Sequence, residues 1–385
     1  MNEQAIANDS TSRPKGIPGA TSALILLILI NLFNYIDRQV LAGVERDIRL
    51  DLLPDDPRAL AKMGYLVFAF MVTYMILAPL FGWLGDRMSR WMLIGVGVIL
   101  WSLASGASGL ANTFLILFLT RCLVGVGEAA YGPVAPTLIS DMYPVEVRGK
   151  VMAWFYAAIP VGSALGYVLG GQVSKAWSWH WAFFLVVPPG ILLGLLCFLY
   201  RDPDRGRADD ITTPQRKPQF RDYTILLHIP SYLLVTAGMT AMTFAMGGLG
   251  FWMKEFLAQH GAEPWLGLEP ITIFGGMTAL AGLLATLIGG AVGDWLRRFF
   301  PSSYFLVSAS AMLIGFPVVL LVVWTPFPDA WWFVFLAVFC LFFNTGPSNT
   351  IIANVTPTGD SLHRLRGQHL HHPRARRCHL SVADR

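Results

Sequence analysis

The chain of 385 residues is 55% hydrophobic and only 14% charged, and its mean hydropathy is +0.54. Soluble domains carry about 25% charged residues, so the composition excludes an ordinary soluble domain and indicates a polytopic membrane protein. The net charge of +4 is small, and the four cysteines lack the paired spacing of a disulfide or metal site. We therefore expect no metal, no cofactor and no nucleic-acid partner.

Ten apolar segments are long enough to cross a membrane, since a spanning helix needs about 20 mainly apolar residues. Residues 1–21 precede them as a polar tail, without the charged-then-apolar order of a cleavable signal. Lys and Arg are more frequent in the segments that share a side with this tail, so we expect a cytoplasmic N-terminus. The predicted spans are 22–44, 64–84, 91–110, 113–140, 150–173, 181–200, 229–257, 270–293, 304–324 and 330–355.

The first span contains NLFNYIDRQV (31–40), in which Asp37 and Arg38 are adjacent. Asp37 lies roughly 20 Å into the helix, at 1.5 Å per residue. In the fourth span, Arg121 and Glu128 are two helical turns apart and share one face. A charge inside a membrane is costly unless it is paired or faces water, and such charges are functional by default. The alternative is a static ion pair that orients the helices.

The loop after the second span, GWLGDRMSR (82–90), has an echo after the eighth span, GGAVGDWLRR (289–298). Gly132-Pro133 in the fourth span likewise recurs as Gly346-Pro347 in the tenth. These echoes predict two parallel pseudo-repeats, residues 22–200 with six helices and residues 229–357 with four. The polar, proline-containing segment 201–228 is predicted to be a cytoplasmic linker between them.

The repeated loop is predicted to form a gate at the cytoplasmic rim. Glycine permits a tight turn and close helix approach, and an aspartate there can pair with an arginine or a helix N-terminus. The alternative is a positively charged turn with no gating role. The residues assigned to the gating motif are Gly82, Gly85, Asp86, Arg87, Arg90, Asp141, Arg148, Gly290, Asp294 and Arg298.

Four stretches resemble the major facilitator superfamily, and more narrowly its spinster-like branch: NYIDR (34–38), RCLVGVGEAAYGPVAPTLISDMYPVEVRGK (121–150), FYAAIPVGSALGYVLGG (155–171) and FFNTGPSNTIIANVTP (342–357). The resemblance covers residues 20–358. It implies two six-helix bundles, alternating access around a central cavity, and proton-coupled or facilitative transport of lysolipids or sphingoid phosphates. No GxxxxGK[ST] loop is present, so an ion gradient is the expected energy source.

In this superfamily the first and fourth spans line the cavity, so the resemblance brings Asp37, Arg38, Arg121 and Glu128 together. Burial disfavours a charged carboxylate and a nearby arginine favours it. We therefore predict that Asp37 and Glu128 carry protons, while both arginines hold them or bind an anionic headgroup. Further predicted substrate contacts, each equally compatible with packing, are Tyr35, Tyr65, Tyr131, Asn344, Thr345 and Asn349. Pro160, Gly162 and Gly166 resemble the superfamily's glycine-proline motif for helix bending and packing.

Residues 358–385 depart from the family pattern and contain five of the eight histidines. A metal or headgroup site is one interpretation. The other is a frameshift near residues 358–361, because codons for this tail, read one base later, can encode an apolar run resembling an eleventh span. Two helices of the second half would then be missing and the chain would be inactive.

The sequence thus predicts a monomeric integral protein of a bacterial inner membrane that is not an enzyme. Its predicted partners are the bilayer, protons and a lipid-like or amphipathic anion. The alternatives are a carrier of small organic acids or drugs, and an inactive truncated product.

Overall fold

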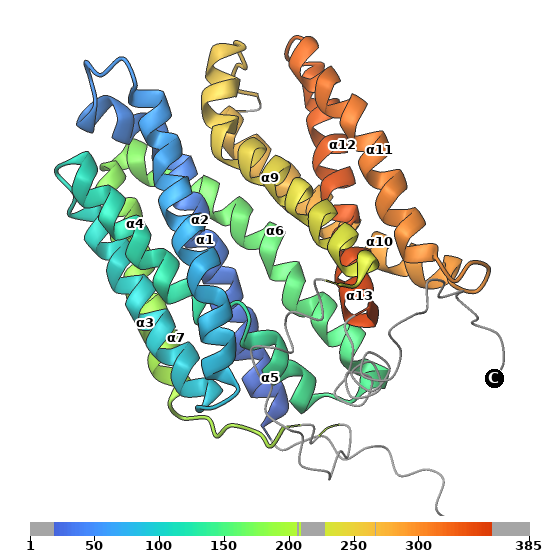
Figure 1. Ribbon diagram of the computed structural model, residues 1–385. Coiled ribbons are helices and arrows are strands. Elements are labelled where there is room, and N and C mark those ends of the chain that lie inside the picture. Colours follow the sequence, from blue (N-terminus) through green and yellow to red (C-terminus); the bar gives the residue numbers. More distant parts are fainter. Residues whose placement is uncertain (1–18, 206–207, 209–227, 266, 356–385) are drawn as a thin grey trace, which may run out of the picture.

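The computed structural model describes residues 19–205, 208, 228–265 and 267–355, and these residues are mostly helical, with connecting turns and loops and one isolated bridge between Trp265 and Leu268. In these ranges, nine segments are long and apolar enough to cross a membrane. This confirms the predicted all-α, polytopic fold (Figure 1). The helices are α1 (Ala20–Leu52), α2 (Ala59–Gly85), α3 (Arg90–Gly109), α4 (Phe114–Ala129), α5 (Ala135–Met142), α6 (Val145–Ala176), α7 (Trp179–Cys197), α9 (Pro230–Gln259), α10 (Pro270–Leu296), α11 (Ser303–Trp324), α12 (Ala330–Phe343) and α13 (Thr345–Val355).

The fourth predicted span, residues 113–140, is wrong as a single helix. The structure has α4, a turn over residues 130–134, and then the short helix α5. α4 ends four residues before Pro133, whose ring lacks an N–H and clashes with the carbonyl four residues earlier. The same spacing recurs in the second half, where α12 ends four residues before Pro347. Both copies of the repeated Gly-Pro pair therefore coincide with a helix interruption.

A preceding glycine distinguishes these prolines from others that lie inside continuous helices. Pro79, Pro160 and Pro317 lie within α2, α6 and α11 without ending them, and none of the three follows a glycine. Glycine lowers helix stability by about 1 kcal/mol relative to alanine. The Gly-Pro pair thus combines two unfavourable residues, which explains why the helix stops there.

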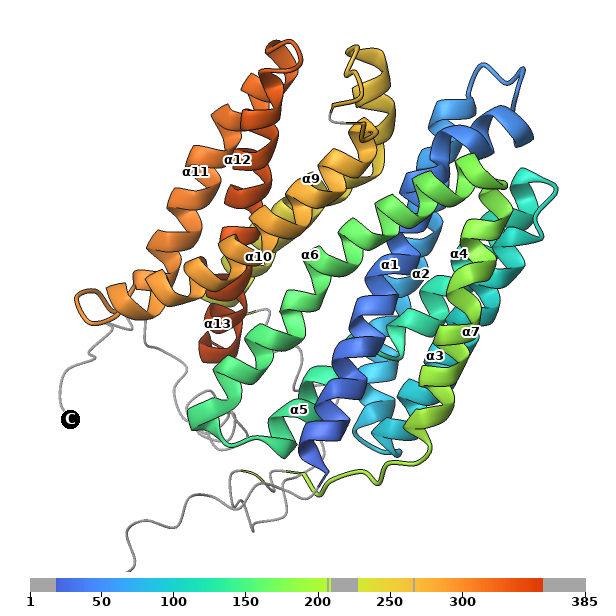
Figure 2. The same ribbon diagram turned by 180° about the vertical axis from the view of Figure 1, so that it is seen from behind.

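The helices form two groups, as Figures 1 and 2 show from opposite sides. In the first, α1 packs along α6, and α3 packs against α4 and α7. In the second, α10 and α11 pack against α12. The groups meet where α6 contacts α10 and α1 contacts α9. Residues 22–200 and 229–357 remain the proposed halves of the protein. The predictions for the N-terminal tail (residues 1–18), most of the linker and the tail 358–385 concern residues outside the described ranges.

The contact between α1 and α6 depends on a row of glycines on α6. A Cβ atom added at Gly162 would lie 2.6 Å from the Leu32 carbonyl oxygen, and one at Gly166 would lie 2.5 Å from the Ile36 carbonyl oxygen. Gly170 continues the row toward Val40 and Gly43. Glycines four residues apart let two helix backbones approach closely. On the other face of α6, Pro160 packs against Gly282 of α10, so α6 is a helix of the first group that packs against the second.

Replacing Gly166 with valine is expected to destabilise the protein by about 1–3 kcal/mol, because overpacking forces neighbouring backbone to move. Unfolding in detergent micelles measures the effect. Gly238→Val is the matched control, since a Cβ atom at Gly238 of α9 meets nothing within 4 Å. Equal stability of the two variants would contradict the close α1–α6 packing.

Candidate functional site: a charged cavity between the two helix groups

A cavity of about 320 Å³ lies between the two groups of helices. Its charged side chains come from α1 and α4, whereas the second group contributes mainly methionine, leucine and phenylalanine side chains. The charges of the cavity are therefore confined to one wall, and the other wall is mostly apolar, with a few neutral polar side chains. The first wall includes Tyr35, Arg38, Gln39, Arg121, Glu128, Tyr156, Ser163 and Tyr167, and the second includes Met239, Met242, Met246, Leu249, Phe251, Phe274, Leu341 and Phe342.

Arg38 and Glu128 form a close ion pair on the polar wall. Arg38 Nη2 lies 2.5 Å and Arg38 Nε 2.6 Å from Glu128 Oε2. Glu128 is 1% exposed, and its other oxygen has no hydrogen-bond partner among the described residues. The Arg38 guanidinium also lies over the rings of Tyr35, Phe70 and Tyr74, at 5.0–5.5 Å from their centroids. Cation–π contacts and the carboxylate together offset the cost of burying this cation.

Asp37 occupies a different position from the one we predicted. It is 2% exposed and does not line the cavity, because it points into the first group of helices, where Ser105 donates a hydrogen bond to it. Among charged side chains, Arg121 interacts with Asp37 most strongly. Arg121 itself lines the cavity, and its Nη2 donates to Ser108 Oγ at 2.6 Å. The four predicted charges thus divide into the Arg38–Glu128 pair on the wall and Asp37 behind Arg121.

Three predicted substrate contacts do not line the cavity, and we withdraw them. Tyr65 is 56% exposed on α2. Tyr131 is buried and its hydroxyl donates to the Leu27 carbonyl oxygen at 2.9 Å, so it connects the turn after α4 to α1. Asn344 is buried where α12 ends and accepts a hydrogen bond from Ser348 Oγ at 2.6 Å. Tyr65 is thus exposed, and the polar groups of Tyr131 and Asn344 bond to neighbouring groups of the protein. The other three candidates, Tyr35, Thr345 and Asn349, do line the cavity.

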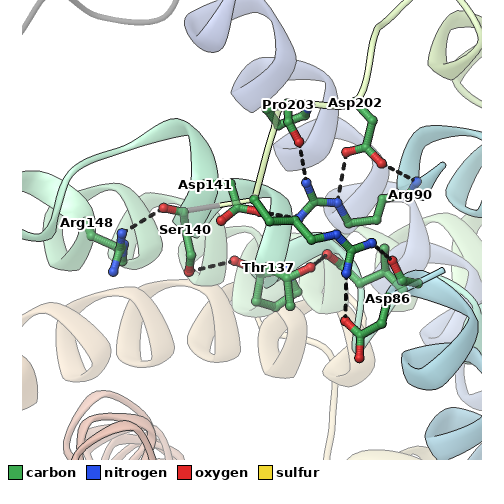
Figure 3. A network of polar contacts seen from close by, with 12 residues as sticks. Asp86, Arg90, Thr137, Ser140, Asp141, Arg148, Asp202 and Pro203 are labelled. Atoms are coloured by element: carbon green, nitrogen blue, oxygen red, sulfur yellow. Dashed lines mark hydrogen bonds and ion pairs between the residues drawn. The ribbon is translucent and has the colours of Figure 1, made fainter. Parts of the chain in front are cut away.

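The first copy of the gating motif forms a network of polar contacts (Figure 3), at the end of the molecule that carries α5 (Figure 1). Arg90 is buried and pairs with Asp141 of α5 and with Asp202, whose Oδ1 lies 2.8 Å from Arg90 Nε. It also donates to the Pro203 carbonyl oxygen at 2.8 Å. Asp86 accepts from Arg205 at 3.1 Å. The contacts of Asp86 and Arg90 therefore tie the α2–α3 turn to α5 and residues 202–205, within the first group rather than across to the second.

The other members of the first motif support the same turn. Gly85 packs closely on Val134, and Gly82 lies near Pro133. The Arg87 guanidinium lies 3.9 Å from the centroid of the Trp83 ring. Arg148 Nη2 donates to the Ser140 carbonyl oxygen at 2.7 Å, which holds the start of α6 against α5.

Replacing Arg90 with methionine is expected to destabilise the protein by about 2–3 kcal/mol, since the buried guanidinium makes charge-assisted hydrogen bonds to Asp141 and Asp202 that methionine cannot make. Arg87→Met is the matched control: Arg87 is an exposed arginine three positions away and should cost about 1 kcal/mol or less. Thermal unfolding of both purified variants measures the difference. A similar loss in both would show that Arg90 has no special structural role.

The second copy of the motif does not reproduce these contacts. Asp294 accepts a hydrogen bond from the Tyr304 hydroxyl at 2.6 Å, and Arg297 lies over the Tyr304 ring. Arg298, the counterpart of Arg90, is exposed and makes no ion pair with any residue that the structure describes. Gly290 packs against Gly346. The echo therefore preserves a helix–loop turn, but not the buried arginine.

Ion pairs between the two groups gather at the opposite end, beside the α1–α2 loop. Asp47 of α1 pairs with Lys254 of α9 at 2.9 Å, and Arg49 of α1 pairs with Glu255 of α9 at 2.7 Å. Lys175 of α6 also pairs with Glu269 before α10. Among the described residues, every ion pair that joins the two groups lies at this end. We call these three pairs the loop-end ion pairs.

The α1–α2 loop has its own polar contacts at this end. Asp56 accepts hydrogen bonds from Lys62 and from the backbone N–H of Arg58, at 2.8 Å for the latter, and these bonds lower the pKa of the Asp56 carboxyl. The negative charge of Asp56 therefore persists under mildly acidic conditions.

Sequence reasoning missed the side chains that surround the predicted charges. Phe70 and Tyr74 of α2 pack on Arg38, and Ser105 and Ser108 of α3 bind Asp37 and Arg121. The spacing of Ser102, Ser105 and Ser108, every third residue in an apolar helix, was a signal for a polar face. Thr278 of α10 was also missed; it lines the cavity and its hydroxyl has no partner within the described ranges.

These features define an integral membrane protein with two helix groups around a charged central cavity. The family model described as Major Facilitator Superfamily matches residues 27–363. The chain belongs to the Major Facilitator Superfamily.

The similarity to spinster proteins that we predicted is also confirmed. Protein spinster of Drosophila melanogaster is 36% identical over 298 residues, which cover 76% of this chain and 49% of the relative. Protein spinster homolog 1 of Homo sapiens is 37% identical over 330 residues, which cover 80% of this chain and 61% of the relative. The chain therefore spans about half to three fifths of the length of these curated relatives.

Two solved structures support the fold. A bacterial homologue of the human lysosomal transporter Spinster, in an inward-facing and unoccupied conformation, aligns with a TM-score of 0.70 at 23% identity, over 91% of this chain and 80% of the other. The xylose transporter XylE from E. coli aligns with a TM-score of 0.66 at 15% identity, over 89% of this chain and 86% of the other.

Proposed function

We propose that the chain is a proton-coupled secondary carrier that moves a lipid-like or amphipathic anion by alternating access. The observation that supports this most is the division of the cavity into a wall with two guanidinium groups and a mostly apolar wall without charged side chains. A phosphate or carboxylate headgroup suits arginine, and an alkyl chain suits methionine side chains, which adapt to irregular shapes. Lysolipids and sphingoid phosphates combine an anionic headgroup with an alkyl chain in this way.

The acids on or behind the polar wall supply the proposed coupling. Glu128 is paired with Arg38, and Asp37 interacts with Arg121. An anion that binds either arginine competes with the acid beside it, and a displaced carboxylate in a dry site gains stability by taking up a proton. Substrate and proton occupancy are thereby linked through the two arginines.

The loop-end ion pairs fit the proposed alternation. They join the two groups at one end, so rocking of the halves would break them and expose the cavity there. The excess of Lys and Arg on the tail side supports a cytoplasmic N-terminus, which makes the loop end the outer side. The proposal further assigns a monomer in a bacterial inner membrane, where the bilayer and a pH gradient are both available.

A carrier of small organic acids or drugs is the second candidate. The cavity volume of about 320 Å³ favours it, because this lies at the lower end of the 300–1,000 Å³ that is typical of ligand pockets.

Uptake into proteoliposomes with an imposed pH gradient tests the proposal and separates the two candidates. The probes are a radiolabelled lysophospholipid, a sphingoid-base phosphate and a sugar acid. We expect gradient-driven uptake of an amphipathic probe, which Asp37→Asn and Glu128→Gln abolish and Asp51→Asn, at the far end of α1, does not. Uptake of the sugar acid alone would favour the second candidate, and uptake that ignores the gradient would contradict proton coupling.

A further inference from the structure

A buried polar cluster lies behind the cavity wall. Ser105 of α3 donates a hydrogen bond to Asp37, and one turn later Ser108 accepts one from Arg121 at 2.6 Å. Both serines are 0% exposed. The single O–H of Ser108 has two acceptors within reach, Thr120 Oγ1 at 2.8 Å and the Ala104 carbonyl oxygen at 3.0 Å. α3 thus presents two hydroxyl groups to two opposite charges.

The charges that act on Asp37 come from its own helix and from α4. Arg121 acts most strongly, Arg38 acts less, and Glu128 is the nearby acid. α3 brings only hydroxyl groups to this cluster, since its single charged residue, Arg90, lies at the other end of the helix. Asp37 and Arg121 make no direct ion pair within 4.0 Å in the described structure. Ser105 bonds to Asp37 where Arg121 could otherwise bond, and Ser108 bonds to Arg121 where Asp37 could otherwise bond.

Two polar atoms in this cluster have no partner among the described residues: Asp37 Oδ2 and Arg121 Nε. Each belongs to a side chain that is 2% exposed, and Arg121 also lines the cavity. Buried polar groups are normally hydrogen-bonded, and an exception requires an explanation. One explanation is that the two groups are held apart so that Asp37 Oδ2 can accept a proton and Arg121 Nε can donate a hydrogen bond to an anion.

We propose that Ser105 and Ser108 are positioning residues that keep Asp37 and Arg121 close but separate. The part of this inference that concerns the substrate anion rests on the proposed function, whereas the part that concerns the proton does not. Ser105 supports the ionised carboxylate by donating to one oxygen and leaves the other oxygen for a proton. Ser108 holds one arm of the guanidinium and leaves Nε for the anion.

The two serines are expected to act in opposite directions. Without the Ser105 hydroxyl, the ionised form of Asp37 loses a donor, so Asp37 takes up its proton at a higher pH. Without the Ser108 hydroxyl, Arg121 is free to pair directly with Asp37, which favours the ionised form and lowers the pH of proton uptake. A hydrogen bond to a charged group corresponds to a displacement of about one pH unit in each case.

Infrared spectroscopy of the full chain in liposomes, titrated with pH, tests the inference without a transport assay. The carbonyl band of protonated Asp37 is the band that disappears in Asp37→Asn. We expect its midpoint to move up by about one pH unit in Ser105→Ala and down by a similar amount in Ser108→Ala. Ser102→Ala is the matched control, because the buried Ser102 hydroxyl bonds only within its own helix, to the Val98 carbonyl oxygen.

Equal midpoints in all four chains would overturn the inference, and so would a shift of the same size in Ser102→Ala or a spectrum with no titrating Asp37 band. Failure of uptake alone would contradict the proposed function and leave the infrared result unchanged, so the two failures can be told apart.

Discussion

Replacing Arg38 with methionine is expected to destabilise the folded protein by about 3–5 kcal/mol, because Glu128 is then left buried without its guanidinium. Glu128 has no other ion-pair partner in the described part of the chain. Methionine preserves much of the side-chain length, so the loss reports the charge rather than a cavity. The free energy of unfolding in mixed micelles measures the effect, and gradient-driven uptake should also be lost.

The double variant Arg38→Met/Glu128→Gln separates the pair from its individual members. Replacing a whole buried ion pair with neutral groups is often nearly neutral, so we expect most of the stability to return. Uptake should not return, because both the anion-binding and the proton-binding groups are gone. A double variant as unstable as Arg38→Met would show that Arg38 acts through its aromatic contacts rather than through Glu128.

Reversing the charge of Lys254 is expected to open the loop end. Lys254→Glu places a negative charge beside Asp47 and Glu255, where Lys254 now pairs with Asp47 and donates to the Gly43 carbonyl oxygen at 2.6 Å. A change of about 1.4 kcal/mol in the balance between conformations is a tenfold change in population. We therefore expect a Thr243→Cys probe on the cavity wall to react about tenfold faster with an impermeant thiol reagent added from that side.

The labelling is measured in a chain whose four native cysteines are replaced by alanine. The charge-swapped variant Asp47→Lys/Lys254→Glu should return the labelling rate toward its original value. Lys175→Glu is the control, because the Lys175 side chain is 57% exposed and its pair with Glu269 should contribute little. Unchanged labelling in Lys254→Glu would mean that the loop-end ion pairs do not keep this side closed.

The fold could be predicted from the sequence wherever apolar composition and the spacing of repeated motifs determine it. Apolar segments of spanning length predicted the long helices, and the repeated loop together with the repeated Gly-Pro pair predicted two related halves. The prediction of one span over residues 113–140 was wrong because apolar composition does not show whether a helix is continuous. A proline after a glycine removes a hydrogen bond within the membrane, and here the chain turns instead of continuing the helix.

The site could be predicted only in part, because helix rotation is not encoded in span composition. Asp37 and Arg38 are adjacent, so they point about 100° apart on a helix. Arg38 therefore reaches the cavity, whereas Asp37 points toward α3. Tyr131 and Asn344 lie within stretches that resemble the family, but each forms a hydrogen bond with a neighbouring group of the protein and does not line the cavity. The α3 serines lay outside those motifs and were missed for that reason.

Proton movement driven by a substrate gradient tests the coupling between the buried charges and the cavity most directly. Proteoliposomes loaded with a pH-sensitive dye receive a gradient of the transported amphipathic anion and no initial pH gradient. We predict that the internal pH changes with the wild-type chain and stays constant with Glu128→Gln. An anion flux that carries no protons in the wild type, or equal pH changes in both chains, would contradict the account.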